Sequence, residues 1–153
     1  MAVVRETLKY GADPFQKDIY GQNSFHHITS MMGPNSLKIL LLLLHKFENS
    51  QRDMNIQDNY GNTPLHNACT FSNKDEVWCT SLRVVVIRIL LANGVNLNEV
   101  NRHKQTPFHL LIFQYHKIVT NYRSENEKFI HNIVALISLF LSYDVDIGDK
   151  RPE

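Results

Sequence analysis

Histidine is the residue whose number and spacing in this 153-residue sequence first suggest chemistry. The chain has eight histidines, and three of them, His26, His66 and His109, recur at intervals of 40 and 43 residues. Imidazole nitrogens are common zinc ligands, but a zinc site needs its ligand nitrogens about 2.0–2.1 Å from one ion. His26 and His27 are adjacent, so on a helix they face different ways and are poor co-ligands. Whether the recurring histidines can share an ion depends on the elements that carry them.

Nucleophilic and phosphate chemistry has little support in the sequence. There is no Gly-x-Ser-x-Gly turn, phosphate-binding loop, His-Glu-x-x-His motif or Rossmann glycine pattern. The two cysteines, Cys69 and Cys79, are too few for a disulfide framework, and we expect reduced thiols. Cys69 follows Ala68 on an expected helix, which predicts a small buried thiol and not a nucleophile. The sequence therefore predicts no enzymatic activity, no catalytic residues and no cofactor.

One short segment occurs three times and supplies the recurring histidines. The clearest copy, at residues 58–68, contains Thr-Pro-Leu-His, and residues 101–111 repeat it as Thr-Pro-Phe-His. Residues 18–28 hold a weaker copy with Asn-Ser-Phe-His, and a second signature appears as Gly-Ala-Asp at 11–13 and Gly-Val-Asn at 94–96. Together these segments resemble the ankyrin repeat, with its Thr-Pro-Leu-His helix start and its Gly-Ala-Asp helix exit.

The spacing of the two signatures separates a constant half of the repeat from a variable half. From Asp13, Asp53 and Asn96 to the next motif histidine the distance is 13 residues each time. From each motif histidine to the following exit residue, the last being Asp146, the distances are 27, 30 and 37 residues. All the length variation therefore falls between the two helices of a repeat. The resulting pitches of 40 and 43 residues exceed the usual ankyrin period of about 33.

Local signals predict where the helices lie. Asn23, Thr63 and Thr106 are expected to cap the first helices, and Pro64 and Pro107 suit the first helical turn. The side chains that follow the prolines should point into the stack. Apolar periodicity predicts a lone second helix at 3–10 and helix pairs at 23–30 and 36–47, 63–72 and 81–93, and 106–115 and 129–143.

Two positions depart from the glycine pattern of the repeats. Gly11 and Gly94 are expected to end second helices in the left-handed conformation. Lys104 replaces a turn glycine and Asp144 an exit glycine, and each costs on the order of 1 kcal/mol if its backbone is left-handed. The first full unit also lacks the motif proline. We therefore expect the outer repeats to be less stable than the unit around residues 63–68.

These elements predict an all-α fold, an ankyrin-repeat solenoid of stacked helix–turn–helix units with short β-hairpin fingers. We expect a single domain over residues 1–153, with a half repeat at 3–17 and repeats at about 18–57, 58–100 and 101–150. No obvious polar capping repeat is present. A fragment, a truncated gene product and a protein that pairs its bare ends all fit this pattern.

The repeat arrangement argues against a shared metal ion. The motif histidines would occupy equivalent places on successive helices, and packed helices lie about 8–10 Å apart. The ankyrin resemblance implies instead that each motif histidine hydrogen-bonds the motif threonine and neighbouring backbone. We therefore expect structural histidines and no metal.

The candidate binding residues lie at the tips of the expected hairpins. Alignment of the constant halves places Ile19, Asn59 and Arg102 in one column, and Tyr20, Tyr60 and His103 in the next. Tyrosine offers a large contact area at low entropic cost and is enriched among binding hot spots. The alternative is that Tyr20 and Tyr60 only pack along the hairpin ladder.

Further contacts are expected from the first helices and from the inserts between helices. Phe71 and Phe113 should lie on the concave first-helix face, together with His27, Ser30, Asn67 and Leu110. The inserts cover residues 31–35, 73–80 and 114–128. We favour a partly helical extension for the last one, with a loop or a binding segment as alternatives. Trp78 is either an exposed anchor or a cover for the adjoining helices.

Charge and composition narrow the class of partner. The formal net charge is +1, from 16 basic and 15 acidic residues, so no overall field favours nucleic acid or acidic lipid. The apolar run at 37–44 is much shorter than the roughly 20 residues of a membrane span. No Asn-x-Ser/Thr sequon is present, which favours an intracellular location, in the cytoplasm or nucleus.

The function that these patterns favour is non-enzymatic binding of a protein or peptide on the concave hairpin and first-helix face. The Asn- and Ile-rich composition and irregular repeats also resemble those of poxvirus ankyrin proteins. That resemblance implies an alternative, in which the chain sequesters a host factor. A structural ankyrin segment of a larger adaptor or channel is a further alternative.

Overall fold

The computed structural model describes residues 2–47, 53–70, 77–121 and 127–143, and its regular elements within these ranges are all helices. The described part of the chain contains α1 (Ala2–Lys9), α2 (Ser24–Ser30), α3 (Ser36–Phe47), α4 (Pro64–Ala68), α5 (Val77–Ala92), α6 (Pro107–Asn121) and α7 (Glu127–Leu141). This confirms the all-helical prediction.

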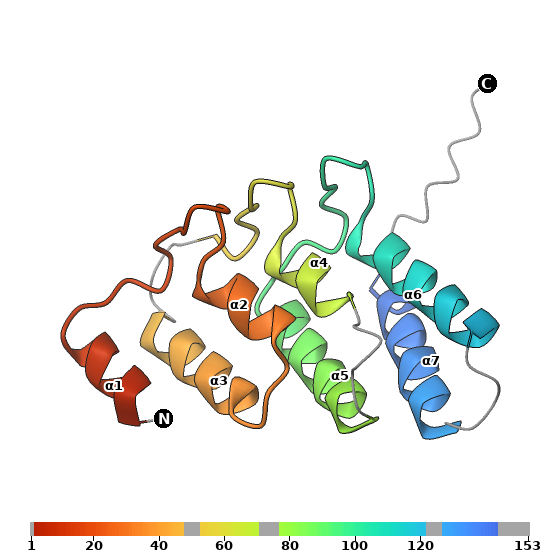
Figure 1. Cartoon of the computed structure of the whole chain (residues 1–153), viewed down its shortest axis with the longest axis horizontal. Coiled ribbons are helices and arrows are strands. Elements are labelled where there is room, and N and C mark those ends of the chain that lie inside the picture. Colours follow the sequence, from red (N-terminus) through yellow and green to blue (C-terminus); the bar gives the residue numbers. More distant parts are fainter. Residues whose placement is uncertain (1, 48–52, 71–76, 122–126, 144–153) are drawn as a thin grey trace.

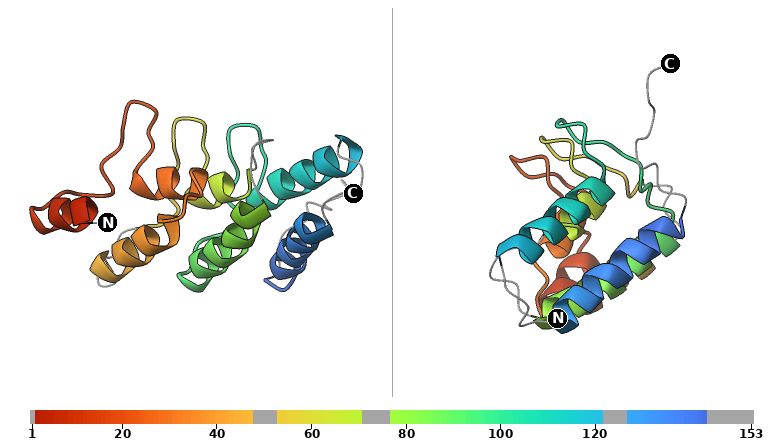
Figure 2. Two further views of the ribbon diagram at one scale, coloured as in Figure 1. Left: turned by 60° about the horizontal axis from the view of Figure 1, so that its bottom comes forward. Right: turned by 90° about the vertical axis from the view of Figure 1, so that its right-hand side faces the viewer.

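The helices form two rows (Figures 1 and 2). The first helices α2, α4 and α6 pack against one another in order, and each contacts the second helix that follows it, namely α3, α5 or α7. Helix α5 also packs on α7. Helix α1 stands at the N-terminal end of the row, and three loops project together beyond the first helices (Figure 1).

Leucine, isoleucine, valine and phenylalanine from both rows make one core. Each second helix is apolar around much of its circumference because other helices cover it on more than one side. The fully buried core residues include Phe25, Leu40, Leu65, Ile87, Leu90, Leu111, Ile133, Leu136 and Phe140. Complete burial of one such side chain contributes about 1.5–3 kcal/mol to folding. Despite this apolar character, no helix in the described ranges is long and apolar enough to cross a membrane.

The predicted caps of the three first helices are confirmed. Asn23 Oδ1 accepts the backbone N–H of the motif histidine three residues later at 3.2 Å. Thr63 Oγ1 and Thr106 Oγ1 accept the equivalent N–H groups at 3.4 and 3.3 Å. Each cap therefore satisfies a donor that the helix itself leaves unpaired.

The missing proline of α2 also has a structural explanation. Pro64 and Pro107 are the first residues of α4 and α6, where a missing N–H is tolerated. Ser24 holds this position in α2, and its N–H donates to the carbonyl of Pro14 at 3.0 Å. A proline at this position would lose that hydrogen bond.

Helix α4 is shorter than the sequence predicted, since it ends at Ala68 and not near residue 72. The backbone tightens there, with the N–H of Thr70 donating to Asn67 O at 3.2 Å. The carbonyl of Ala68 accepts Nη1 of Arg83 at 3.2 Å, so it is already engaged where a longer helix would have used it. The buried Arg83 side chain, which comes from α5, also lies 3.5 Å from Thr29 O near the end of α2. A cation is favoured beside the negative ends of helices.

The other helix boundaries also differ from the predicted ones. Helix α5 begins at Val77, four residues earlier than expected, so Trp78 lies in a helical turn and not in an insert. Asp75 and Glu76 precede this start in the sequence, and acidic residues favour a helix N-terminus. Helix α6 continues to Asn121, in agreement with the partly helical extension expected for the last insert.

Residues with a left-handed backbone occur at described positions where the repeat pattern predicts a glycine. Gly11 and Gly94 have φ values of 88° and 77° just beyond α1 and α5, which confirms the predicted helix exits. Lys104 has a φ of 58°, so this residue holds the conformation that was expected to cost on the order of 1 kcal/mol. Asp144 lies outside the described residues.

Candidate protein-binding surface

The three projecting loops share one backbone geometry, and we call them finger 1 (residues 18–22), finger 2 (58–62) and finger 3 (101–105). In each finger the N–H of the first residue donates to the carbonyl of the fifth, at 2.8, 2.9 and 3.0 Å respectively. The N–H of the fourth residue donates back to the first carbonyl at 2.9, 3.0 and 2.9 Å. The expected β-hairpin geometry is not confirmed, because these described loops consist of turns without strand.

A short polar side chain at the base holds each finger in shape. Oδ1 of Asp18, Asp58 and Asn101 accepts the N–H of the third and the fifth finger residues at 2.8–3.0 Å. Such contacts explain why Asp or Asn stands at this position, since both side chains can bond the backbone two residues ahead. Burial raises the pKa of Asp18, but hydrogen bonds from Gln22, His27 and Tyr20 outweigh it and lower the pKa below its ordinary value.

Backbone hydrogen bonds join neighbouring fingers into a ladder. The N–H of Asn59 donates to Tyr20 O at 2.9 Å, and the N–H of Arg102 donates to Tyr60 O at 3.0 Å. Asn59 adds a side-chain bond, from Nδ2 to Ile19 O at 3.0 Å. The ladder uses the carbonyls of the two tyrosines, so their rings are not needed to hold the fingers together.

Close packing between fingers explains the glycines of fingers 1 and 2. A Cβ on Gly21 would lie 2.5 Å from Asn59 Oδ1, and a Cβ on Gly61 would lie 2.8 Å from the backbone nitrogen of Arg102. Both glycines also have positive φ, at 74° and 79°. Glycine is therefore required at these two sites by the neighbouring finger as well as by the backbone conformation.

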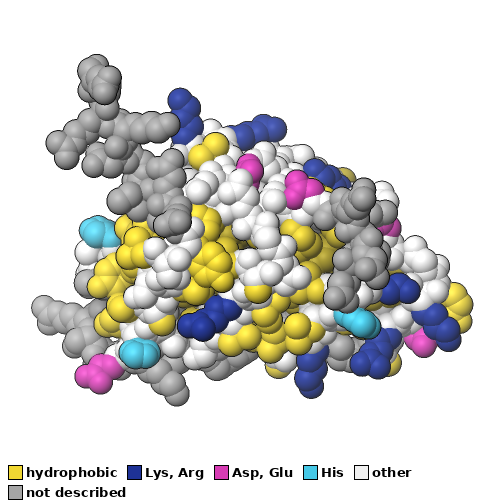
Figure 3. All heavy atoms as spheres, turned by 180° about the vertical axis from the view of Figure 1, so that it is seen from behind, with side chains coloured by type: hydrophobic (Ala, Val, Ile, Leu, Met, Phe, Trp, Pro, Cys, Tyr) yellow, Lys and Arg dark blue, Asp and Glu magenta, His cyan; other side chains and the backbone are white. Residues whose placement is uncertain are grey.

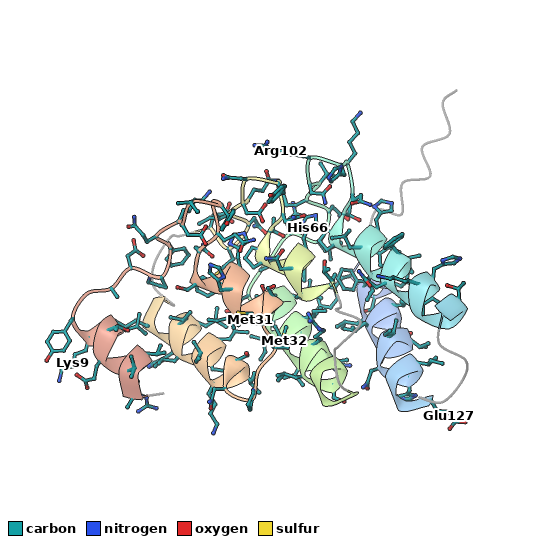
Figure 4. The ribbon with its side chains drawn as sticks, in the orientation of Figure 1. Lys9, Met31, Met32, His66, Arg102 and Glu127 are labelled. Atoms are coloured by element: carbon teal, nitrogen blue, oxygen red, sulfur yellow. The ribbon has the colours of Figure 1, made fainter. Side chains whose placement is uncertain are left out.

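Six of the eight candidate site residues lie on the fingers. Ile19 is 84% exposed, and Tyr20 and Tyr60 are 55% and 57% exposed. Asn59, Arg102 and His103 are also exposed, although the amide donor of Asn59 is used by the ladder. Figure 4 shows Arg102 at the projecting end of the loops and His66 beneath them, where the loops meet the first helices.

The remaining two candidates are not in the fingers. Phe113 is 59% exposed on α6, four residues after the motif histidine of that helix. Phe71 lies outside the described residues, as does the side chain of Trp78. The fingers therefore form the better defined part of the candidate surface.

The motif histidines bridge consecutive repeats. Nδ1 of His66 lies 2.9 Å from Thr63 Oγ1, and its Nε2 lies 3.0 Å from Gln105 O in finger 3. His26 reaches finger 2 in the same way, with Nε2 3.0 Å from Asn62 O. Burial lowers the pKa of both histidines below the ordinary value of 6.5. For His66 this confirms the predicted hydrogen bonds to the cap and to the backbone. The sequence did not predict that the backbone partner of each histidine lies in the next finger.

The thiol of Cys69 lies in the hydrophobic core. Cys69 is fully buried, and burial raises the pKa of its thiol, so the reactive thiolate is disfavoured. Within the described ranges no three His, Cys, Asp or Glu side chains gather as a metal site requires.

Two of the hollows on the described surface involve α1. One of about 680 Å³ is lined by α1 and residues 10–12. The other, of about 350 Å³, lies between α1, α2 and α3. Neither of these two hollows contains a finger residue.

Helix pairs repeated along the chain, with matching loops that hydrogen-bond to one another, define a repeat protein. The sequence model of the family described as ankyrin repeats (3 copies) matches residues 27–121. The match covers more than half of the chain, and the chain therefore belongs to the ankyrin-repeat family.

A known relative agrees with this assignment. An ankyrin repeat protein of fowlpox virus (strain NVSL) is 33% identical to this chain over 89 residues, which is 58% of the chain. The matched region is only 17% of the length of that relative.

Proposed function

We propose that the chain binds a protein or peptide on the surface formed by the three fingers and the exposed side of the first helices, without catalysing a reaction. Ankyrin repeats are generally protein-interaction modules, which supports the class of function. A solenoid arrangement of the repeats would let each finger add a similar increment of contact.

The exposed aromatic and aliphatic side chains on a fixed backbone carry this proposal. Tyr20 and Tyr60 occupy equivalent places on adjacent fingers, and the ladder bonds between their carbonyls and the next finger hold the spacing. Each of the two residues is more than half exposed. Tyrosine supplies a large contact area at low conformational-entropy cost, which favours it as a contact residue.

The second helices also expose apolar side chains and supply a control surface. Leu41, Val85 and Val134 are 48%, 42% and 46% exposed on α3, α5 and α7. Figure 3, which shows the molecule from behind, has hydrophobic side chains gathered across its middle. Unlike the finger tyrosines, these residues lie on helix faces that have no backbone ladder to fix their spacing.

The similarity to a fowlpox protein supports an alternative in which the bound protein is a host factor. That reading changes the identity of the partner and leaves the surface unchanged. A structural role within a larger protein would instead leave the fingers without a partner.

The test compares two double variants of the full chain. Tyr20→Ala with Tyr60→Ala should reduce the recovery of a bound protein in a pull-down at least several-fold, since hot-spot truncations commonly cost more than about 1 kcal/mol. The helical circular dichroism should be unchanged, because the ladder uses backbone atoms. Leu41→Ala with Val85→Ala is the matched control and should leave recovery unchanged. Unchanged recovery with the tyrosine pair altered, or a large loss of stability, would refute the proposal.

A further inference from the structure

Formal charge changes abruptly along the row of fingers. Finger 1 and finger 2 each carry one carboxylate, from Asp18 and Asp58, and no Lys or Arg. Finger 3 carries Arg102 and Lys104 and no carboxylate. The formal charges of the three fingers are therefore −1, −1 and +2, a step of three units between finger 2 and finger 3.

Three substitutions within the repeat, at positions 101, 102 and 104, produce this step without changing the finger fold. Asn101 replaces the aspartate of the other fingers, and its Oδ1 makes the same two backbone bonds. Its Nδ2 also donates to Asn62 Oδ1 at 3.0 Å, a bond that a carboxylate could not make. Lys104 replaces the glycine and keeps the left-handed backbone, at φ 58°.

Lys104 also keeps the outer side of finger 3 open. At the equivalent Gly61, an added Cβ would meet the backbone of the next finger at 2.8 Å. Since Lys104 carries a Cβ, another finger cannot stack on finger 3 in that register. Arg102, His103 and Lys104 are all exposed. Among the described residues, neither Arg102 nor Lys104 takes part in an ion pair.

We infer that finger 3 is a binding site for carboxylate side chains of the partner, so that the partner segment lies across the fingers with its acidic end at finger 3 and apolar side chains at Tyr20 and Tyr60. This inference rests on the proposed function and gives it a direction. Exposed cations attract such groups and help to set the orientation of a bound segment.

The partner that fits this charge pattern is an acidic protein segment. A nucleic acid carries negative charge along its whole length and would lie along fingers 1 and 2, whose formal charge is also negative, as well as along the cations of finger 3. A segment with its charge at one end avoids that repulsion. Adjacent repeats are about 10 Å apart. An extended chain advances about 3.3 Å per residue, so roughly six residues separate the apolar contact at finger 1 from the acidic contact at finger 3.

The experiment selects peptides from a random phage-displayed 12-residue library on the full chain and measures their affinities by fluorescence anisotropy. The test variant is Arg102→Gln with Lys104→Gly, which puts at position 104 the glycine that fingers 1 and 2 have. Lys38→Gln with Arg88→Gln removes the same charge from exposed positions on α3 and α5 and is the control. Selected peptides should contain Asp or Glu about six residues from an aromatic or aliphatic residue.

Affinity for these peptides should fall roughly two- to thirtyfold in the test variant and remain unchanged in the control, as expected for two exposed ion pairs. Replacement of the peptide carboxylates by amides should abolish the difference between wild type and test variant. Peptides without acidic residues, or peptides that bind the test variant as well as the wild type, would overturn the inference. If those same peptides lose affinity in the Tyr20→Ala, Tyr60→Ala variant, the proposed function stands. If they do not, it falls as well.

Discussion

Asn23 makes a poorer contact with its motif histidine than Thr63 does, and the difference predicts that Asn23→Thr stabilises the protein. Nε2 of His26 lies 3.0 Å from the carbonyl of Asn62, so the neutral ring carries its proton on Nε2 and Nδ1 is an acceptor. Nδ1 then faces Asn23 Oδ1, another acceptor, at 2.8 Å. A flip of the Asn23 amide would put its NH₂ group against Nδ1 of His26. The flip is excluded because Oδ1 accepts the backbone N–H of Phe25 at 3.1 Å, and an NH₂ group could not. Protonation of Nδ1 would relieve the contact, but burial lowers the pKa of His26.

Threonine resolves this conflict. The Thr63 hydroxyl can donate to His66 Nδ1, 2.9 Å away, while Oγ1 accepts the His66 N–H at 3.4 Å. A net hydrogen bond contributes about 0.5–1.5 kcal/mol, and the hydroxyl of threonine would supply one where Asn23 Oδ1 and His26 Nδ1 now face each other as two acceptors. Asparagine is a slightly better helix cap than threonine, which offsets part of the gain. We therefore expect Asn23→Thr to raise the free energy of unfolding by about 1 kcal/mol and Tm by about 2–4 °C.

Urea unfolding of Asn23→Thr and of the reciprocal Thr63→Asn variant checks this reasoning. The second variant should lose about 1–2 kcal/mol, since it introduces the same acceptor pair into α4. In a His26→Ala background the gain from Asn23→Thr should disappear, because the contact is the source of the effect. A gain that persists without His26, or a Thr63→Asn variant as stable as wild type, would refute the argument.

Three further outcomes follow from the described residues. In urea melts, Leu65→Ala should lower the free energy of unfolding by about 2–5 kcal/mol, because Leu65 is fully buried. Thr63→Ala should lower it by about 0.5–2 kcal/mol, because Thr63 contributes a helix cap. The reverse ranking would contradict the packing. Since burial lowers the pKa of His26 and His66, below pH 6.5 the unfolded chain binds protons that the folded chain does not. Stability should therefore decline from pH 7.5 to pH 5, and a midpoint that holds steady would count against buried neutral histidines. Lys104→Gly should stabilise the chain by roughly 0.5–1 kcal/mol, because glycine adopts a positive φ without strain, and thermal melts showing a loss would be inconsistent with that account.

The parts of the fold that were predicted correctly from the sequence depend on local signals. Thr63, Pro64 and Leu65 specify a cap, a first helical residue and a buried side chain within three consecutive positions, and all three assignments are confirmed. The left-handed backbone of Lys104 could likewise be predicted, because the repeat aligns it with Gly61. These features need only the geometry of a few neighbouring residues.

The features that were missed depend on partners distant in sequence. Nothing in the sequence around Arg83 indicates that its guanidinium reaches carbonyls of α2 and α4, and that contact helps to explain why α4 ends at Ala68. For the candidate surface, the constant spacing brought Tyr20 and Tyr60 into one column. It could not show that the carbonyls of these residues, and not their rings, join the fingers.

The ladder also explains why one half of each repeat keeps a constant length while the other half varies. Two kinds of bond cross from one repeat to the next within the constant half, namely the carbonyl of Tyr20 to the N–H of Asn59 and Nε2 of His26 to the carbonyl of Asn62. The finger and the histidine lie on either side of the same short connection. A residue inserted between them would therefore shift one bond relative to the other, and both could not form together. Among the described residues this pairing of bonds lies in the constant half, and the segments between the two helices of a repeat are outside that half. Length variation can accumulate in those segments while the finger tips remain in register, which is the condition that an extended binding surface requires.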